Sequence, residues 1–366
     1  MRLKTAIYPD ILRSTSKNRR PQLSYANSLE NQQIIQSLSL LHEDFIPTPW
    51  LSNSHTQMIF YSLRKVKYKQ NHLETSLYDY REQLTMRDGG LTALYWYGYD
   101  LPPNTPTIVV LHTITGSPES MAELVRDLHS HTGWRIVLCL RRGHGDLQLK
   151  TPRLNLLGCT HDLREQLDII RIRFAKSPLY AVGSSAGSGL LVRYLGEEGH
   201  AAAFVASFAY CPGYDSAKSF NQIHPTYSRM MTKKLIKQFI QPNQALISHL
   251  STAKSLEKSA DLATLYKELY QLAGYGSYAE YDLATNPTHV LPDIRTPLMV
   301  LNAEDDPICR ITNLDPWRET MEAMPNIILI TTAEGSHCAH YEGWSARSWS
   351  ARLIGNYFKE VAKQKV

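Results

Sequence analysis

Short apolar runs alternate with segments of helical periodicity along most of the chain. Such runs lie near 107–112, 134–140, 178–183, 203–210, 297–302 and 326–331. Apolar residues recur three and four positions apart in the segments between the first four runs, and again at 344–363. Uninterrupted apolar runs are typical of parallel strands buried on both faces, which the intervening helices would cover. The pattern therefore predicts an α/β fold with a mostly parallel sheet.

Two elements before residue 100 depart from this alternation. Residues 75–98 have the pattern of two strands joined at Asp88-Gly89-Gly90, so we expect an antiparallel N-terminal hairpin. Residues 28–42 have the pattern of a short amphipathic helix. The apolar residues on one face of that helix are Ile34, Ile35, Leu38 and Leu41.

The strand-helix alternation stops between residues 212 and 293. This segment has helical patterns instead, at about 233–240 and 256–272. We expect a helical insertion that forms a lid between two parts of the α/β core, 28–211 and 294–366. Residues 1–27 are expected to be a basic, flexible tail.

Composition and charge describe an ordinary globular protein. Of 366 residues, 43% are hydrophobic and 20% are charged. Residues 1–20 alone account for the whole net charge of +5, so the remainder is close to neutral. Since no basic stripe is expected on the folded part, a nucleic-acid partner is not expected. The basic start leaves three alternatives open: a disordered tail, a peripheral membrane contact or an organelle presequence. No run has the length of a transmembrane helix, and none suits a signal peptide.

The cysteines indicate reduced thiols. Their number is odd and none form a Cys-x-x-Cys pair, so a cytoplasmic location is expected. No cluster has metal-ligand spacing and no phosphate-binding loop is present, so we expect neither a metal nor a cofactor. The oligomeric state is left open. The five cysteines are Cys139, Cys159, Cys211, Cys309 and Cys338.

The segment Gly183-Ser184-Ser185-Ala186-Gly187 lies between an apolar run and a helical pattern. A Gly-x-Ser-x-Gly at a strand-to-helix turn is the nucleophile elbow, in which the glycines permit a sharp turn that exposes the central serine. Ser185 is therefore the expected nucleophile, and Ser184 occupies the variable position. The alternative is a small-residue turn that only packs a helix against a sheet.

An acid and a base follow in the order that an α/β-hydrolase requires. The acid comes after the apolar run at 297–301, where Asp306 is favoured over Asp305 by its position before Pro307. The aspartate that does not serve as the acid would cap a helix or a turn. The base comes after the run at 327–330, where His337 is favoured because it directly follows Gly-Ser. His340 is expected at the surface or facing the lid.

Two backbone N–H groups are expected to form an oxyanion hole. One belongs to Ala186, which follows the nucleophile, and the other to Ile114, in the loop after the apolar run at 107–111. A His-Gly-x-x-Gly loop is expected at this place, but Thr113 follows His112 here. A β-branched residue adopts fewer backbone conformations than glycine, so this substitution puts the loop geometry in question.

As an ordered set, several motifs between about residues 45 and 360 resemble the YheT-like branch of the α/β-hydrolases, which includes ABHD-type lipases and yeast ester-forming acyltransferases. The chain departs from the family at Thr113, at Ala186 and in the polar loop Arg142-Gly143-His144-Gly145-Asp146. The matching stretches are Pro47-Thr48-Pro49-Trp50-Leu51, His55-Thr56-Gln57, Asp88-Gly89-Gly90, the loop 112–117, Thr151-Pro152-Arg153-Leu154, Asp162-Leu163-Arg164, the elbow, Tyr194-Leu195-Gly196-Glu197-Glu198-Gly199, the segment 302–307 and the segment 335–337.

The resemblance implies a catalytic triad of Ser185, Asp306 and His337. It also implies a serine esterase or lipase whose substrates are short- or medium-chain acyl esters or monoacylglycerol-like lipids. Two alternatives remain open. The same triad would serve an alcohol O-acyltransferase, and a hydrolase scaffold can carry a binding protein without catalysis.

Overall fold

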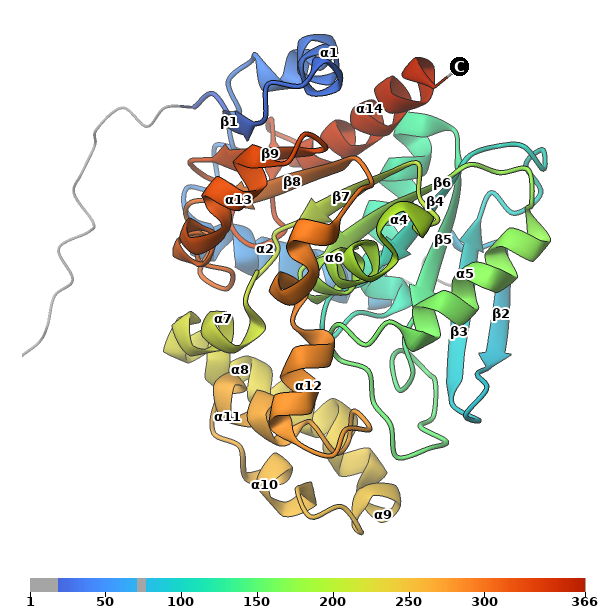
Figure 1. Ribbon diagram of the computed structural model, residues 1–366. Coiled ribbons are helices and arrows are strands. Elements are labelled where there is room, and N and C mark those ends of the chain that lie inside the picture. Colours follow the sequence, from blue (N-terminus) through green and yellow to red (C-terminus); the bar gives the residue numbers. More distant parts are fainter. Residues whose placement is uncertain (1–18, 71–76, 366) are drawn as a thin grey trace, which may run out of the picture.

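A nine-stranded sheet runs through the part of the molecule that the computed structural model describes, residues 19–70 and 77–365 (Figure 1). Its strand order is β1-β9-β8-β7-β6-β4-β5-β3-β2. The strands are β1 (Gln22–Tyr25), β2 (Tyr80–Thr85), β3 (Leu91–Tyr97), β4 (Thr107–Leu111), β5 (Arg135–Leu140), β6 (Leu179–Ser184), β7 (Ala206–Tyr210), β8 (Leu298–Ala303) and β9 (Ile327–Thr332).

The strand directions confirm the predicted sheet. Strands β4 to β9 pair with one another in parallel. The hairpin β2–β3 is antiparallel and joins the sheet through antiparallel pairing of β3 with β5. All six predicted parallel strands are present, because each is an apolar run that the sheet buries on both faces.

The opposite edge of the sheet differs from the prediction. Strand β1 pairs antiparallel with β9, from Gln22 opposite Thr331 to Tyr25 opposite Ile328. The expected flexible tail through residue 27 is therefore wrong for this segment, whereas residues 1–18 lie outside the described residues. Four residues of mixed polarity carry little strand signal of their own. They are ordered by the free edge of β9 and by partial packing of Leu23 and Tyr25 on the core.

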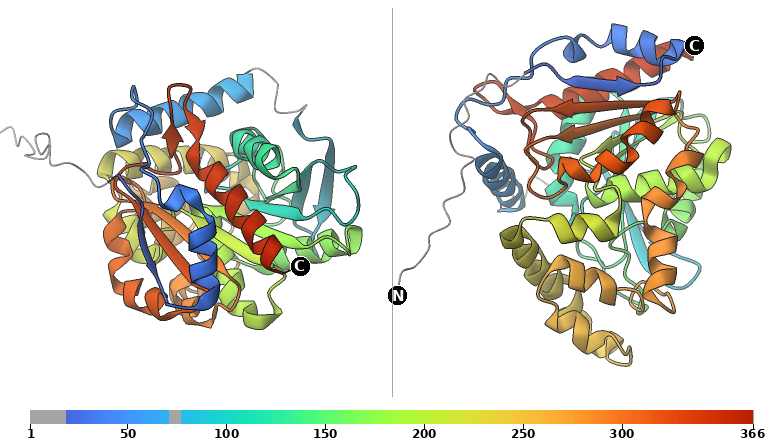
Figure 2. Two further views of the ribbon diagram at one scale, coloured as in Figure 1. Left: turned by 90° about the horizontal axis from the view of Figure 1, so that it is seen from above. Right: turned by 60° about the vertical axis from the view of Figure 1, so that its left-hand side comes forward.

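Helices cover both faces of the sheet, as the alternation predicts (Figure 2). One face packs against α1 (Leu29–Ser37), α4 (Pro118–Thr132) and α14 (Trp349–Gln364), and α2 (Ser54–Gln70) lies on α4. The other face packs against α5 (His161–Arg173), α6 (Ala186–Glu198) and α13 (Arg318–Ala323). A small hairpin of β10 (Tyr341–Glu342) and β11 (Arg347–Ser348) precedes α14, which therefore begins later than predicted.

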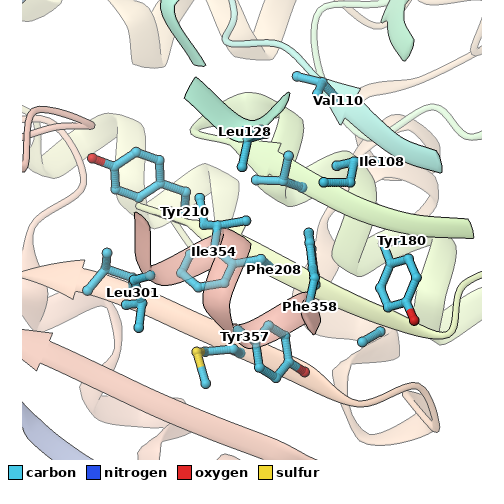
Figure 3. Close-up of a cluster of buried hydrophobic side chains, with 14 of the residues drawn as sticks. Ile108, Val110, Leu128, Tyr180, Phe208, Tyr210, Leu301, Ile354, Tyr357 and Phe358 are labelled. Atoms are coloured by element: carbon cyan, nitrogen blue, oxygen red, sulfur yellow. The ribbon is translucent and has the colours of Figure 1, made fainter. Parts of the chain in front are cut away.

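The core on the α14 face is rich in aromatic side chains. Phe208 from β7 and Tyr180 from β6 face Tyr357 and Phe358 of α14 (Figure 3). Phe208, Tyr357 and Phe358 are at most 2% exposed. Burying each such side chain stabilises the fold by about 1.5–3 kcal/mol, so this cluster fixes α14 on the sheet.

The segment between β7 and β8 is helical, as predicted, and we call residues 212–293 the helical insertion. Its apolar residues form a third cluster, shared with the loops after β4, β5 and β8 and distinct from the two clusters that flank the sheet. Its helices lie to one side of the sheet in Figure 1. They are α7 (Ser216–Gln222), α8 (Pro225–Leu235), α9 (Gln244–Ile247), α10 (Ala253–Lys258), α11 (Leu262–Glu268) and α12 (Tyr278–Thr285).

A buried ion-pair network ties the β2–β3 turn to the loop after β5. Arg142 binds Asp162 through Nε at 2.8 Å and Nη2 at 2.5 Å, and Asp88 through Nη1 at 2.9 Å and Nη2 at 3.1 Å. The hydrogen bonds from Arg142 hold the pKa of Asp88 well below its usual range. A Cβ at Gly90 would lie 2.4 Å from the guanidinium, so glycine makes room for this arginine.

Substituting Arg142→Met should lower the free energy of unfolding by about 3–5 kcal/mol at neutral pH, because it leaves Asp162 charged and buried without a partner. The pKa of Asp88 is lowered by folding, so the contribution of the Arg142–Asp88 pair is present above about pH 4 and is lost as the pH falls. Denaturant unfolding at pH 7 and at about pH 2.5 measures both effects. The control is Arg153→Met, which removes an exposed partner of Asp88 and should cost less than about 1 kcal/mol. Equal losses for the two variants would contradict the assigned role.

Candidate active site

Ser185 occupies the sharp turn between β6 and α6. Its φ of 53° and ψ of −118° lie in a region that non-glycine residues rarely adopt. A hydrogen bond from the Ser185 N–H to the Tyr210 carbonyl, 2.8 Å long, holds the turn against β7. The side chain is half-buried, whereas Ser184 is buried at the end of β6. The strained turn thus exposes Ser185 and buries its neighbour.

The two glycines of the motif are required by close contacts. A Cβ at Gly187 would lie 2.1 Å from the carbonyl oxygen of Leu111 in β4. A Cβ at Gly183 would lie 2.3 Å from the carbonyl oxygen of Gly187. The turn folds so tightly onto itself and onto β4 that neither position has room for a side chain.

Three expected side chains come together at this turn. The Nε2 atom of His337 lies 2.8 Å from the Oγ of Ser185, and its Nδ1 atom lies 2.8 Å from the Oδ2 of Asp306. The other carboxylate oxygen of Asp306 accepts the N–H groups of Ile308 at 2.7 Å and Cys309 at 2.9 Å. Asp306 is 4% exposed and His337 is 7% exposed. The serine, imidazole and carboxylate form a continuous hydrogen-bonded chain.

Asp305 has a different partner. Its Oδ1 accepts the N–H of Ser336 at 2.8 Å, so this carboxylate holds the loop that carries His337 without touching the imidazole. That loop is tightly wound, since Ser336 and Cys338 both have positive φ, 52° and 57°. The two adjacent aspartates therefore have separate tasks: Asp306 binds the ring and Asp305 fixes the backbone beside it.

Burial and the charge of Asp306 act in opposite directions on His337. Burial is the largest single influence and opposes protonation of the imidazole, but the charge and hydrogen bond of Asp306, together with Cys338 and Cys309, outweigh it, and the pKa of His337 is raised well above its ordinary value. The protonated imidazole is therefore stabilised within the buried pair.

His340 is a correction to the sequence analysis. It is 1% exposed, and its ring nitrogens lie 3.0 Å from the hydroxyls of Tyr210 and Thr332. Burial and the nearby His337 lower the pKa of His340 to about 3, so it stays neutral. The position of His340 in the sequence after β9 could not distinguish a surface histidine from one that the 335–340 loop folds back into the core.

Buried thiols surround His337. Cys211 and Cys338 each lie close to the imidazole, and Cys309 lies near Asp306. Among the described residues, the two groups with metal-ligand proximity both include His337. Its ring nitrogens already contact Asp306 and Ser185, so a metal ion there would displace one of these hydrogen bonds.

The loop after β4 brings the Ile114 backbone to the serine. Ile114 and Ala186 both line the cavity at Ser185. Within the described part of the chain, neither N–H donates a hydrogen bond to the protein. Thr113 does not require a positive φ. Glycine is instead needed at position 116, where a Cβ would lie 2.5 Å from the His112 ring.

Two residues that the sequence analysis did not single out support this loop. The Arg141 guanidinium, 3% exposed, donates from Nη2 to the carbonyls of His112 at 3.1 Å and Thr113 at 2.7 Å. His144 Nε2 lies 3.1 Å from the Ile114 carbonyl. These contacts hold the carbonyl groups of three successive residues in the loop that carries Ile114.

An apolar cavity opens from Ser185 and encloses about 590 Å³, including its open mouth. The helical insertion supplies much of its wall. From the core side it is lined by residues that follow β6 and β8, including Ile308 next to the acid. The residues of the insertion that line it include Phe220, Ile223, Met231, Thr285 and Pro287.

A family model described as the alpha/beta hydrolase fold matches residues 106–343, about two thirds of the chain. The chain belongs to the α/β-hydrolase family. The expected superfamily and fold are thereby confirmed. In an α/β-hydrolase the turn after β6, the loop after β8 and the loop after β9 meet at one edge of the sheet, where this chain places Ser185, Asp306 and His337.

Similar proteins carry lipase and esterase names. Mouse monoacylglycerol lipase ABHD2 is 24% identical, with 94% of this chain and 86% of the relative covered. Medium-chain fatty acid ethyl ester synthase/esterase 2 of Saccharomyces cerevisiae is 27% identical, covering 69% of this chain and 62% of its own length. The Pyrococcus furiosus esterase Pf2001 has a similar fold, with a TM-score of 0.50, 16% identity, and 76% of this chain and 89% of that chain covered.

Among the described residues of this α/β-hydrolase, none of the helices combines the length and the apolar character that a membrane span needs.

Asp306→Asn removes the negative charge that favours the protonated imidazole, while the burial that disfavours it remains. The pKa of His337 should therefore fall below its wild-type value. Asp305→Asn changes the carboxylate that binds the Ser336 N–H and should leave the pKa of His337 close to its wild-type value. NMR titration of ¹⁵N-labelled histidine measures both variants, with the His337→Gln spectrum identifying the signal. A larger drop in Asp305→Asn than in Asp306→Asn would overturn the assignment of the partner.

Proposed function

We propose that this α/β-hydrolase is a serine hydrolase that cleaves carboxylic esters through an acyl-enzyme. The observation that carries the proposal is the hydrogen-bonded chain from Ser185 Oγ through His337 to Asp306, in which both distances are 2.8 Å. Ser185 borders an apolar cavity. The lipase and esterase names of the relatives agree with the proposal.

In the proposed mechanism, Ser185 Oγ attacks the ester carbonyl while His337 Nε2 takes its proton. Asp306 keeps Nδ1 protonated and stabilises the imidazolium that forms. The imidazolium then protonates the leaving alcohol. Water, deprotonated by His337, attacks the acyl-enzyme and releases the acid. Because the base must be neutral, activity requires a pH above the pKa of His337.

The N–H groups of Ile114 and Ala186 would bind the oxyanion of each tetrahedral intermediate. One such donor contributes roughly 3 kcal/mol to transition-state stabilisation. In this assignment Arg141 and His144 are positioning residues, because they hold the carbonyls of the loop and do not touch the substrate. A preorganised loop costs no rearrangement when charge develops.

The cavity favours an acyl chain of short or medium length. Its lining is mostly apolar, and it includes side chains from α7 and α8, such as Phe220 and Met231. Such a pocket binds an alkyl chain by burial of its methylene groups, at about 0.8 kcal/mol each. Acyl esters or monoacylglycerol-like lipids are the substrates that we propose, and the helical insertion would be the lid.

Acyl transfer to an alcohol is the second candidate, favoured by the yeast relative, whose name includes both synthase and esterase. The same acyl-enzyme would be intercepted by an alcohol instead of water. The ratio of ethyl ester to free acid in an assay that contains ethanol distinguishes the two. A binding protein without catalysis is disfavoured, since it has no use for three groups held in catalytic geometry.

Substituting Ser185→Ala should reduce hydrolysis of p-nitrophenyl butyrate to below about a thousandth of wild type, because the nucleophile is lost. It should also abolish labelling by a fluorophosphonate probe, mapped to residue 185 by mass spectrometry. Ser184→Ala is the matched control, since Ser184 is buried in β6, and should keep label and activity. The mechanism would be refuted if Ser185→Ala were still labelled, or if well-folded wild-type protein were not labelled.

Met231→Trp should shift the chain-length preference toward shorter esters. The larger side chain would fill part of the cavity that Met231 lines, so kcat/KM for octanoate should fall at least tenfold while that for acetate stays within about twofold. A series of p-nitrophenyl esters from acetate to dodecanoate measures this. The control is Met230→Trp, one residue away on the exposed side of α8. Parallel losses for all esters would place the acyl chain elsewhere.

A further inference from the structure

Two long segments of the chain contain basic residues but no acidic ones. No Asp or Glu occurs between Phe45 and Leu73, a stretch that contains α2 with four Lys and Arg residues. None occurs between Ser216 and Leu256 either, where six Lys and Arg residues lie. The near-neutral total beyond the first twenty residues therefore conceals two acid-free segments that together carry ten Lys and Arg residues.

These two helices are neighbours. His55 at the start of α2 lies 2.7 Å from the Tyr227 hydroxyl of α8, and their rings stack. Burial and the nearby Lys234 ammonium lower the pKa of Lys65 to about 8, which places these two positive groups close together. Figure 2 shows α2 beside the helical insertion in its right-hand view. The two basic segments thus form one surface.

An apolar stripe runs along the outer face of α2. Ile59, Leu63 and Val66 are 59%, 61% and 49% exposed. At 100° per residue they fall within an arc of about 60°. Met230 is similarly exposed on α8, and Trp50, whose ring packs on Phe60 of α2, is half exposed on the other side of the stripe. Aliphatic side chains in a row, flanked by exposed lysines such as Lys67, are typical of helices that lie in a membrane interface.

The same surface borders the candidate active site. The Oγ of Ser336, beside His337, donates to the Ser54 carbonyl at the first residue of α2. On the other side, Lys234 Nζ lies 3.1 Å from the Thr115 hydroxyl, next to Ile114. Met231 lines the cavity one residue after the exposed Met230. A lipid held at this surface would be within reach of Ser185.

We propose that α2 and α8 form a docking surface for a bilayer that contains anionic phospholipids. The apolar residues enter the headgroup region while the lysines and arginines bind phosphate and carboxylate groups. This proposal deepens the proposed function, on which it rests for the use of the site, by naming a membrane as the source of the ester. A nucleic acid or an acidic protein would match the charge but not the aliphatic stripe. The docking surface consists of Ile59, Leu63, Val66, Lys67, Arg229, Met230, Lys233 and Lys237.

Vesicle flotation with the full-length protein tests the surface. Binding to phosphatidylcholine vesicles with 30% phosphatidylserine should exceed binding to pure phosphatidylcholine at least tenfold, and should weaken as NaCl rises from 0.1 to 0.5 M. The triple variant Ile59→Ser, Leu63→Ser, Val66→Ser and the double variant Lys233→Glu, Lys237→Glu should each lower binding at least tenfold. The basic N-terminal residues are present in every variant and contribute equally.

Matched controls lie on or just after α5, which packs on the sheet face opposite to the one that supports α4 and α2. Ile172→Ser removes a side chain that is 82% exposed, and Arg171→Glu with Lys176→Glu reverses two exposed charges. Both controls should bind vesicles as wild type does. Loss of binding in the charge variant alone would indicate a polyanion and overturn the membrane assignment, as would binding unchanged in both surface variants.

Activity separates this proposal from the proposed function. The triple serine variant should hydrolyse a water-soluble ester at the wild-type rate but a vesicle-embedded monoacylglycerol at least tenfold more slowly. Ser185→Ala should bind vesicles normally while hydrolysing neither. Vesicle binding without any esterase activity in wild type would refute the proposed function and leave the surface intact. Esterase activity of the wild-type protein without vesicle binding would refute the docking surface and leave the proposed function intact.

Discussion

The close contact between the β6–α6 turn and β4 is the constraint on which the candidate site depends. With Gly187 pressed against the Leu111 carbonyl, the chain must turn so sharply that Ser185 takes a positive φ. The cost of that backbone conformation, about 1–3 kcal/mol, is offset by the buried parallel strands on either side. Because β4 also carries the loop with Ile114, one contact fixes the positions of both the serine hydroxyl and the nearby N–H group.

Rigid loops at neighbouring strand ends complete the arrangement. The acid and the base follow β8 and β9, which pair in parallel, so their loops emerge side by side. The two adjacent aspartates have different partners. Asp306 accepts hydrogen bonds from the imidazole and from two backbone N–H groups, whereas Asp305 accepts one from the Ser336 N–H. A single carboxylate could not satisfy both the ring and the loop backbone, which explains why the sequence has a pair there.

Those parts of the structure that depend on local pattern could be predicted from the sequence. The six parallel strands are buried apolar runs, and the elbow is a short motif in a strand-to-helix context, so both leave a strong signal. Strand β1 leaves little, because its order comes from the edge of β9, more than 300 residues away. Arg141 and His340 were not identified for a similar reason. A buried arginine that binds carbonyls and a core histidine look in sequence like ordinary polar residues until the partners from other strands are known.

The net charge of a chain does not show how its charged residues are distributed over the folded surface. A chain that is neutral beyond its first twenty residues can still carry a strongly charged surface if its acids and bases are segregated along the sequence. Here the acids are absent from two segments about 150 residues apart, and the fold brings those segments together beside the loop that carries His337. The interaction of exposed charges falls off over about 10 Å, so only such spatial clustering creates a local potential. In the docking surface that we propose, this clustering beside the candidate site would link the charge of the two helices to the delivery of a substrate.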